Sequence, residues 1–155
     1  FFDSDHAHDT KTRKSITGVL VIVGSTPVNW LSKRQGAVAT STYSAEFCAM
    51  RTATEEAIAI RYMLRSLGVP VNQPTKLFGD NLGVIQNASM PEANLVKKHV
   101  AIAFHSVRES VAAEIIAPYH IDGKDNFADI LTKALDITTF KHHAWDLLWH
   151  TSTRM

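Results

Sequence analysis

The chain has little cysteine, little net charge and no long apolar run. Its single cysteine, Cys48, cannot form an internal disulfide, which excludes a disulfide scaffold and suits a reducing compartment. Sixteen Lys and Arg against 15 Asp and Glu leave a net charge of +1, so any polyanion must be held by local patches or by metal ions. The longest apolar run, "VLVIVG", is too short to span a membrane, and we expect a soluble protein without a membrane partner.

Apolar residues, by contrast, make up 45% of the 155 residues, which is enough for one proper core and too little for two. The sequence shows no repeat, no low-complexity stretch and no linker. We therefore predict a single domain over residues 1–155. It opens on "FFDSD", without a methionine and directly in a strand-like segment, which suggests a piece of a larger polypeptide.

Strand and helix patterns follow one another in an order typical of an α/β fold. Short turns between the first three strands indicate an antiparallel meander, and Gly68 and Pro70 end the first helix. The predicted strands are 1–5, 15–24, 28–33, 75–80 and 114–121, and the predicted helices are 43–67, 81–89, 97–113, 125–135 and 138–150. This order predicts a five-stranded mixed sheet, three antiparallel strands and then two parallel ones, flanked by helices.

An acid interrupts the apolar stripe of the first helix. Steps of three and four residues backwards from Leu67 pass through apolar positions and then reach Glu46. Asp3 closes the first strand, Asp80 ends the fourth, and Asp129 lies early in the segment after the fifth. In the simplest threading the first and fourth strands are neighbours, so the four carboxylates can converge on one point.

Such a cluster repels itself unless divalent cations neutralise it. Oxygen ligands without nearby thiolates favour Mg²⁺ or Mn²⁺ over zinc. Each acid also has a structural explanation: Glu46 suits the positive end of a helix dipole, Asp80 can cap the following helix, and Asp129 can be a solvated helix residue. Asp5 shares the strand face of Asp3 and is the alternative leading ligand. The occurrence of all four acids in order favours a shared role.

Four blocks of the sequence carry a family resemblance: "FFDSD", "TYSAEFCAM", "LFGDN" and "NFADILTK". They resemble the acid-bearing blocks of the ribonuclease H domain in copia-type (Pseudoviridae) LTR retrotransposon polyproteins, and the match spans about residues 1 to 135. The resemblance implies a ribonuclease H-like fold joined in its parent to a reverse transcriptase domain. It also implies an endonuclease that cleaves the RNA strand of RNA–DNA hybrids during reverse transcription, in cytoplasmic virus-like particles.

The resemblance further implies two Mg²⁺ ions, for which Mn²⁺ can substitute, and a role for each acid. Asp3 would bridge both ions, Glu46 and Asp80 would bind the ion on the leaving-group side, and Asp129 would bind the ion that activates water. The alternative is a catalytically inactive ribonuclease H-like scaffold or nucleic-acid-binding domain. Retention of all four acids favours the enzyme, and Glu46 distinguishes the pattern from that of integrases and resolvases.

Auxiliary and substrate-binding candidates are less specific. His120 precedes Asp129 by nine residues, where related nucleases carry a mobile histidine that assists product release, although "HIDGKDN" departs from the Pro-Thr pattern of copia-type sequences. Asp5 is a second auxiliary candidate. Small polar and basic side chains suit ribose hydroxyls and phosphates. The candidates of this kind are Ser41, Thr42, Ser44, Asn81, Lys97 and Lys98.

Overall fold

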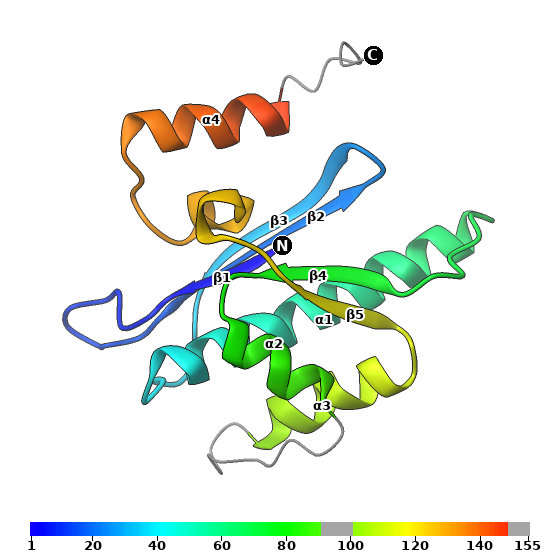
Figure 1. Ribbon diagram of the computed structural model, residues 1–155, viewed down its shortest axis with the longest axis horizontal. Helices are drawn as coiled ribbons and strands as arrows, with labels where there is room; N and C mark the ends of the chain where they lie inside the picture. Colours follow the sequence, from blue (N-terminus) through cyan, green and yellow to red (C-terminus); the bar gives the residue numbers. More distant parts are fainter. Residues whose placement is uncertain (91–100, 149–155) are drawn as a thin grey trace.

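The first three strands form the predicted antiparallel meander in a computed structural model that describes residues 1–90 and 101–148 (Figure 1). The strands are β1 (Phe2–Asp5), β2 (Ile16–Val23) and β3 (Thr26–Arg34). Asp3 lies opposite Gly18 in the register of β1 and β2. Val21 and Ile22 of β2 pair with Asn29 and Pro27, so Val28 of β3 is left unpaired and forms a bulge close to the tight turn between the two strands.

The other two strands, β4 (Thr75–Gly79) and β5 (Ile116–His120), pair in parallel as a second sheet that adjoins the first where β4 contacts β1. The predicted α/β order is thus confirmed, although hydrogen bonding divides the five strands into two sheets. Side chains occupy the free edge of β1: the Asn126 amide donates to the Phe2 carbonyl at 3.0 Å, and the Ser4 N–H donates to Glu46 at 3.3 Å. These bonds take the place of a ladder between β1 and β4.

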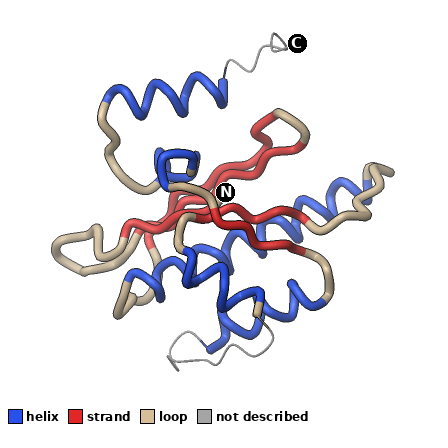
Figure 2. The backbone as a smooth tube through the Cα atoms, in the orientation of Figure 1, coloured by secondary structure: helices blue, strands red, loops and turns tan. Residues whose placement is uncertain are grey.

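Helices cover both sides of the strands (Figures 1 and 2). The four α-helices are α1 (Thr42–Ser66), α2 (Leu82–Ser89), α3 (Ala101–Ala112) and α4 (Ile137–Leu148). Ser41 caps α1 by accepting from the Ser44 N–H, and Gly68 follows its end with a φ of +77°, a conformation that glycine adopts without strain. None of the described helices is long and apolar enough to cross a membrane.

The predicted helix over 125–135 is wrong. Two 3₁₀ turns replace it, η2 (Gly123–Asp125) and η3 (Phe127–Leu131). Asn126 separates them, because its backbone is extended and its side-chain oxygen accepts from the Ala128 N–H at 3.2 Å, which starts a new turn. The part of the predicted helix 97–113 before Ala101 lies outside the described residues.

The main core lies between the sheets and the layer formed by α1, α2 and α3. Phe47 of α1 meets Phe104 of α3 with ring centroids 5.6 Å apart, and Phe2 and Met50 are fully buried beside them. On the opposite side of the sheets η3 packs on β2, and α4 lies beyond it (Figure 1). Asp3 on β1 therefore lies between these two layers.

Candidate metal centre

Three of the four predicted acids meet where β1, α1 and β4 adjoin. Asp3 lies on β1, Glu46 in the second turn of α1 and Asp80 directly after β4. Each offers a carboxylate oxygen, and these oxygens all lie within 4.8 Å of one another. Asp3 and Glu46 are only 2% and 4% exposed, and Asp80 is partly buried. Three negative groups from distant parts of the chain therefore share one small volume.

Two glycines permit this close approach. A Cβ atom built on Gly79 would lie 2.4 Å from the Phe2 ring, so only glycine lets β4 lie against β1 at this point. A Cβ atom on Gly18 would lie 2.6 Å from Thr132 Cγ2 and 2.8 Å from the Ala128 carbonyl oxygen, so glycine also lets the η3 segment approach β2. Sequence reasoning missed both residues, although a glycine within a strand was the available signal.

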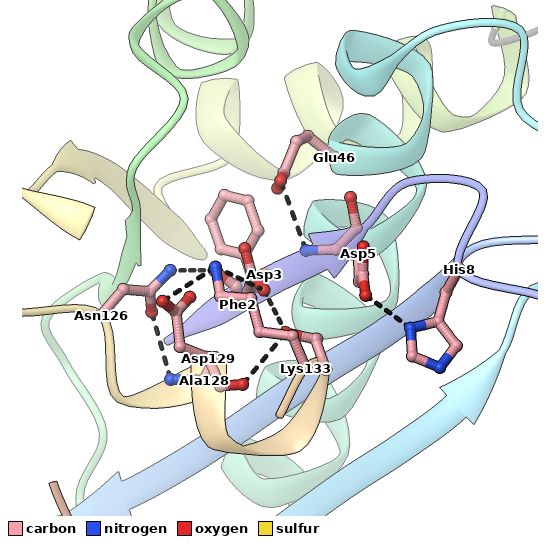
Figure 3. Close-up of polar contacts among 11 residues, drawn as sticks. Phe2, Asp3, Asp5, His8, Glu46, Asn126, Ala128, Asp129 and Lys133 are labelled. Atoms are coloured by element: carbon pink, nitrogen blue, oxygen red, sulfur yellow. Dashed lines mark hydrogen bonds and ion pairs between the residues drawn. The ribbon is translucent and has the colours of Figure 1, made fainter. Parts of the chain in front are cut away.

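The fourth acid, Asp129, lies on η3 beside the three-acid group. Its Oδ2 atom is 2.9 Å from Nζ of Lys133, and that ammonium is 4.0 Å from Oδ2 of Asp3 (Figure 3). The bonds of Asn126 to Phe2 and Ala128 fix η3 against β1. Asp129 is thus linked to Asp3 through a lysine, which the sequence analysis did not anticipate.

Thr132 fixes the orientation of Asp3. Its buried hydroxyl donates to Oδ2 of Asp3 and lies 3.2 Å from the Asp129 carbonyl oxygen. Thr132 and Lys133 directly follow the "ADIL" segment in "NFADILTK". Their proximity in sequence to Asp129 was the only available signal for them.

Burial and mutual repulsion disfavour the ionised form of these acids. Burial, followed by the charges of Asp3 and Asp80, raises the pKa of Glu46 to about 9. Burial and then Asp3 also raise the pKa of Asp80. Burial raises the pKa of Asp129 to about 6, because desolvation outweighs the attraction of Lys133.

The donor set fits hard divalent cations. Oε2 of Glu46 and Oδ1 of Asp129 are buried with no hydrogen-bonding partner in the described part of the chain. A divalent cation would satisfy such oxygens and reverse the repulsion that raises the pKa values. All donors of the three-acid group are carboxylate oxygens, which suits Mg²⁺ or Mn²⁺.

Two of the structural explanations for the acids do not fit this geometry. Asn81 caps α2, because its Oδ1 accepts from the Val84 N–H at 3.2 Å, so Asp80 is not required for capping. Glu46 lies beyond the first turn of α1, where the helix dipole has little effect, and points into the cluster. Both acids therefore lack an ordinary helix-end role.

The remaining candidates lie around this group. Asp5 forms a hydrogen bond with His8 at 2.5 Å, outside the three-acid group. His120 is exposed, and its Nε2 donates to the Asp80 carbonyl oxygen at 3.1 Å. Thr42 begins α1, directly after the capping Ser41. Lys97 and Lys98 lie outside the described residues, as does His99.

The fold is that of ribonuclease H. Ribonuclease H1 from the halophilic archaeon Halobacterium salinarum superimposes with a TM-score of 0.63 at 16% identity, covering 84% of this chain and 90% of that chain. LC11-RNase H1, isolated from compost, gives a TM-score of 0.65 at 14% identity, covering 84% and 89%. These likenesses define the class of fold, and they agree with the prediction from the sequence.

In sequence the chain is homologous to retrovirus-related Pol polyproteins of plant transposons, which confirms the predicted resemblance. It is 31% identical over 144 residues to the polyprotein of transposon RE1 and 30% identical over 142 residues to that of RE2, both from Arabidopsis thaliana. These matches cover 93% and 92% of this chain, and the chain spans about 10% of the length of each polyprotein. No family model matches the chain.

Proposed function

We propose that residues 1–155 form the ribonuclease H domain of a retrotransposon Pol polyprotein and act as an endonuclease on the RNA strand of RNA–DNA hybrids. The observation that carries the proposal is the group formed by Asp3, Glu46 and Asp80, with carboxylate oxygens within 4.8 Å of one another in a ribonuclease H fold. Burying three acids together is costly for a domain with a purely structural role, and a shared cation explains the arrangement.

Asp3 is the proposed bridging ligand. One of its carboxylate oxygens lies within 4.8 Å of oxygens of Glu46 and Asp80, and Oδ2 accepts from Thr132 and lies 4.0 Å from the Lys133 ammonium that also contacts Asp129. It therefore belongs to both halves of the acid cluster. Glu46 and Asp80 would hold one Mg²⁺ or Mn²⁺ ion with it, and Asp129 would hold the second.

Two bound ions would supply an activated water and compensate the charge that develops on the leaving oxygen. The protein itself contributes the placement of the acids. Thr132 orients Asp3, the Ser4 N–H orients Glu46, and Asn126 holds the η3 turn that carries Asp129. This placement favours a single geometry of the phosphodiester relative to the acids.

Substrate selection would rest on shape and phosphate contacts, because the net charge of +1 gives no general attraction to nucleic acid. The polar residues at the start of α1, Ser41, Thr42 and Ser44, and Asn81 at the start of α2, flank the acid-bearing residues Glu46 and Asp80. We propose Ser41, Thr42 and Asn81 as contacts to ribose hydroxyls. Ser44 is only 1% exposed and its hydroxyl bonds that of Ser41, so its burial does not fit a contact with substrate. The reverse transcriptase domain of the parent polyprotein, inside cytoplasmic virus-like particles, would supply further grip on the hybrid.

The test is cleavage of a labelled RNA–DNA hybrid by the purified chain. We expect cutting of the RNA strand only with Mg²⁺ or Mn²⁺, leaving 3′ hydroxyl and 5′ phosphate ends, and complete loss of cutting in Asp80→Asn. Asp146→Asn is the matched control, because Asp146 lies on α4, away from the acid cluster, and contacts the exposed His142 at 3.1 Å. A folded chain that binds hybrid and never cuts it would instead support the inactive scaffold.

A further inference from the structure

Lys133 occupies the site together with the acids. Its ammonium lies 2.9 Å from Oδ2 of Asp129 and 4.0 Å from Oδ2 of Asp3. The Lys133 side chain is 40% exposed, whereas those of Asp129 and Asp3 are 9% and 4% exposed. A flexible cation thus reaches from the surface to two nearly buried carboxylates.

The backbone turn after Asp129 places the Lys133 ammonium beside the Asp129 carboxylate. The N–H groups of Thr132 and Lys133 both donate to the Asp129 carbonyl, at 3.1 and 3.2 Å, so the chain turns immediately after Asp129. This turn sets Lys133 four residues after Asp129 on the same side, where an ion pair forms readily. It also brings Thr132 onto Asp3, so one short segment supplies both a hydroxyl and a cation to the acids.

A divalent ion bound between Asp129 and Asp3 would lie close to the ammonium, because the unpartnered Oδ1 of Asp129 and the Oδ2 that holds Lys133 belong to the same carboxylate. Oδ2 of Asp129 accepts a charge-assisted hydrogen bond from the ammonium, and two cations a few ångströms apart repel strongly in a partly buried site. The ammonium can leave, because its stem is long and the side chain is 40% exposed. Ion pairing by Lys133 therefore opposes ion binding by Asp129 and Asp3.

We propose that Lys133 is a built-in competitor for the divalent ion held by Asp129 and Asp3, and that it sets the affinity and selectivity of this half of the site. The inference rests on the proposed function, because it assumes that these acids bind metal. Lys133 acts through the acids, so it is a positioning and tuning residue. A divalent cation displaces the ammonium, whereas a monovalent cation, with half the charge, competes poorly against it.

The experiment is calorimetric titration of the full chain with Mg²⁺ and, separately, with Mn²⁺. Lys133→Gln should bind the ion at least about tenfold more tightly than the wild-type chain, because one nearby positive charge is removed. Lys133→Arg should stay within about threefold of the wild type, because it keeps the charge. Lys124→Gln is the matched control: it removes the same charge from an exposed lysine paired with Asp122 at 3.7 Å, and the affinity should stay within about twofold.

A second measurement uses the wild-type chain and covers the case in which Lys133→Gln fails to fold. The ¹⁵N NMR signal of the Lys133 ammonium, assigned by its loss in Lys133→Arg, should shift to the position of a solvated lysine as Mg²⁺ saturates the site. A signal that does not change at saturation overturns the inference, as does a Lys133→Gln affinity equal to or below that of the wild type. Wild-type protein that binds no divalent ion overturns the proposed function itself.

Discussion

Replacing Glu46 by glutamine should stabilise the fold while abolishing its activity. Glutamine keeps the shape of the side chain and the oxygen that accepts from the Ser4 N–H, and it removes a carboxyl group whose ionised form is disfavoured by burial and then by the charges of Asp3 and Asp80. Glu46 is only 4% exposed, so solvent screens the charges of Asp3 and Asp80 only weakly at this position. The variant therefore distinguishes the effect of Glu46 on the free energy of unfolding from its role in hybrid cleavage.

The magnitude follows from the pKa of Glu46, which rises from 4.5 to about 9 on folding. The folded chain keeps this proton up to about pH 9, whereas the unfolded chain releases it near pH 4.5, so the wild type loses stability as pH rises between these values. The loss is about 1.4 kcal/mol per pH unit, or about 3 kcal/mol at pH 7. Glutamine does not titrate, so Glu46→Gln should exceed the wild type by that amount, or by about 6–12 °C in Tm.

The assay is urea unfolding followed by circular dichroism, in a chelator, at half-unit steps from pH 4.5 to 8.5. The difference between Glu46→Gln and the wild type should be near zero at pH 4.5 and grow with pH. Added Mg²⁺ should then stabilise the wild type more than the variant, which keeps only the acids proposed for the second ion intact. Glu55→Gln is the control on the same helix, because Glu55 is half exposed and pairs with Arg51, and its effect should stay below about 0.5 kcal/mol at every pH.

A difference that does not widen between pH 5 and pH 8 would refute this reasoning, and so would a Glu46→Gln chain less stable than the wild type at pH 7. Either result would mean that Glu46 is ionised and well compensated in the fold without metal. The stability of the acid cluster would then need a different explanation.

Three further substitutions test packing and hydrogen bonding, two of them beside the acids and one at the loop before β4. Gly18→Ala should lower the free energy of unfolding by about 1–3 kcal/mol, because its Cβ would meet the Thr132 side chain, whereas Gly36→Ala, with nothing within 4 Å, should change urea unfolding little. Thr132→Val removes the hydroxyl that orients Asp3, and calorimetry should show Mg²⁺ binding weakened about tenfold at unchanged circular dichroism. Arg61→Met should cost about 2–4 kcal/mol in urea unfolding, because carbonyl oxygens of the loop before β4 lose a buried donor, while hybrid cleavage by the folded chain persists.

The features that the sequence predicts best depend on local spacing. The helical period of α1 and the stop signals at its end predict both its extent and the inward position of Glu46. The meander follows from short turns between β-branched segments, and the neighbouring positions of β1 and β4 follow from the simplest connection. The sequence therefore predicts that Asp3, Glu46 and Asp80 lie close together.

The features that the sequence does not predict depend on contacts between distant residues. The pattern over 125–135 is helical, but Asn126 bonds the Phe2 carbonyl, 124 positions away in the chain, and this contact divides the segment into two short turns. The position of Asp129 outside the three-acid group, and its ion pair with Lys133, follow from this division into two turns. Gly18 and Gly79 likewise have a meaning only once the atoms opposite them are known.

The same contacts explain why the sheet is interrupted at the site. In an antiparallel pair, alternate residues turn their backbone groups to opposite edges, and on the edge of β1 that faces β4 these groups belong to Phe2 and Ser4. The Asn126 amide donates to the Phe2 carbonyl, and Glu46 accepts from the Ser4 N–H. Two side chains thus provide the hydrogen bonds that a neighbouring strand would otherwise form. Asp3 lies between these two anchors. A displacement of α1 or η3 is therefore transmitted to β1 through a hydrogen bond, and the distance between the acids is fixed by backbone pairing as well as by side-chain packing.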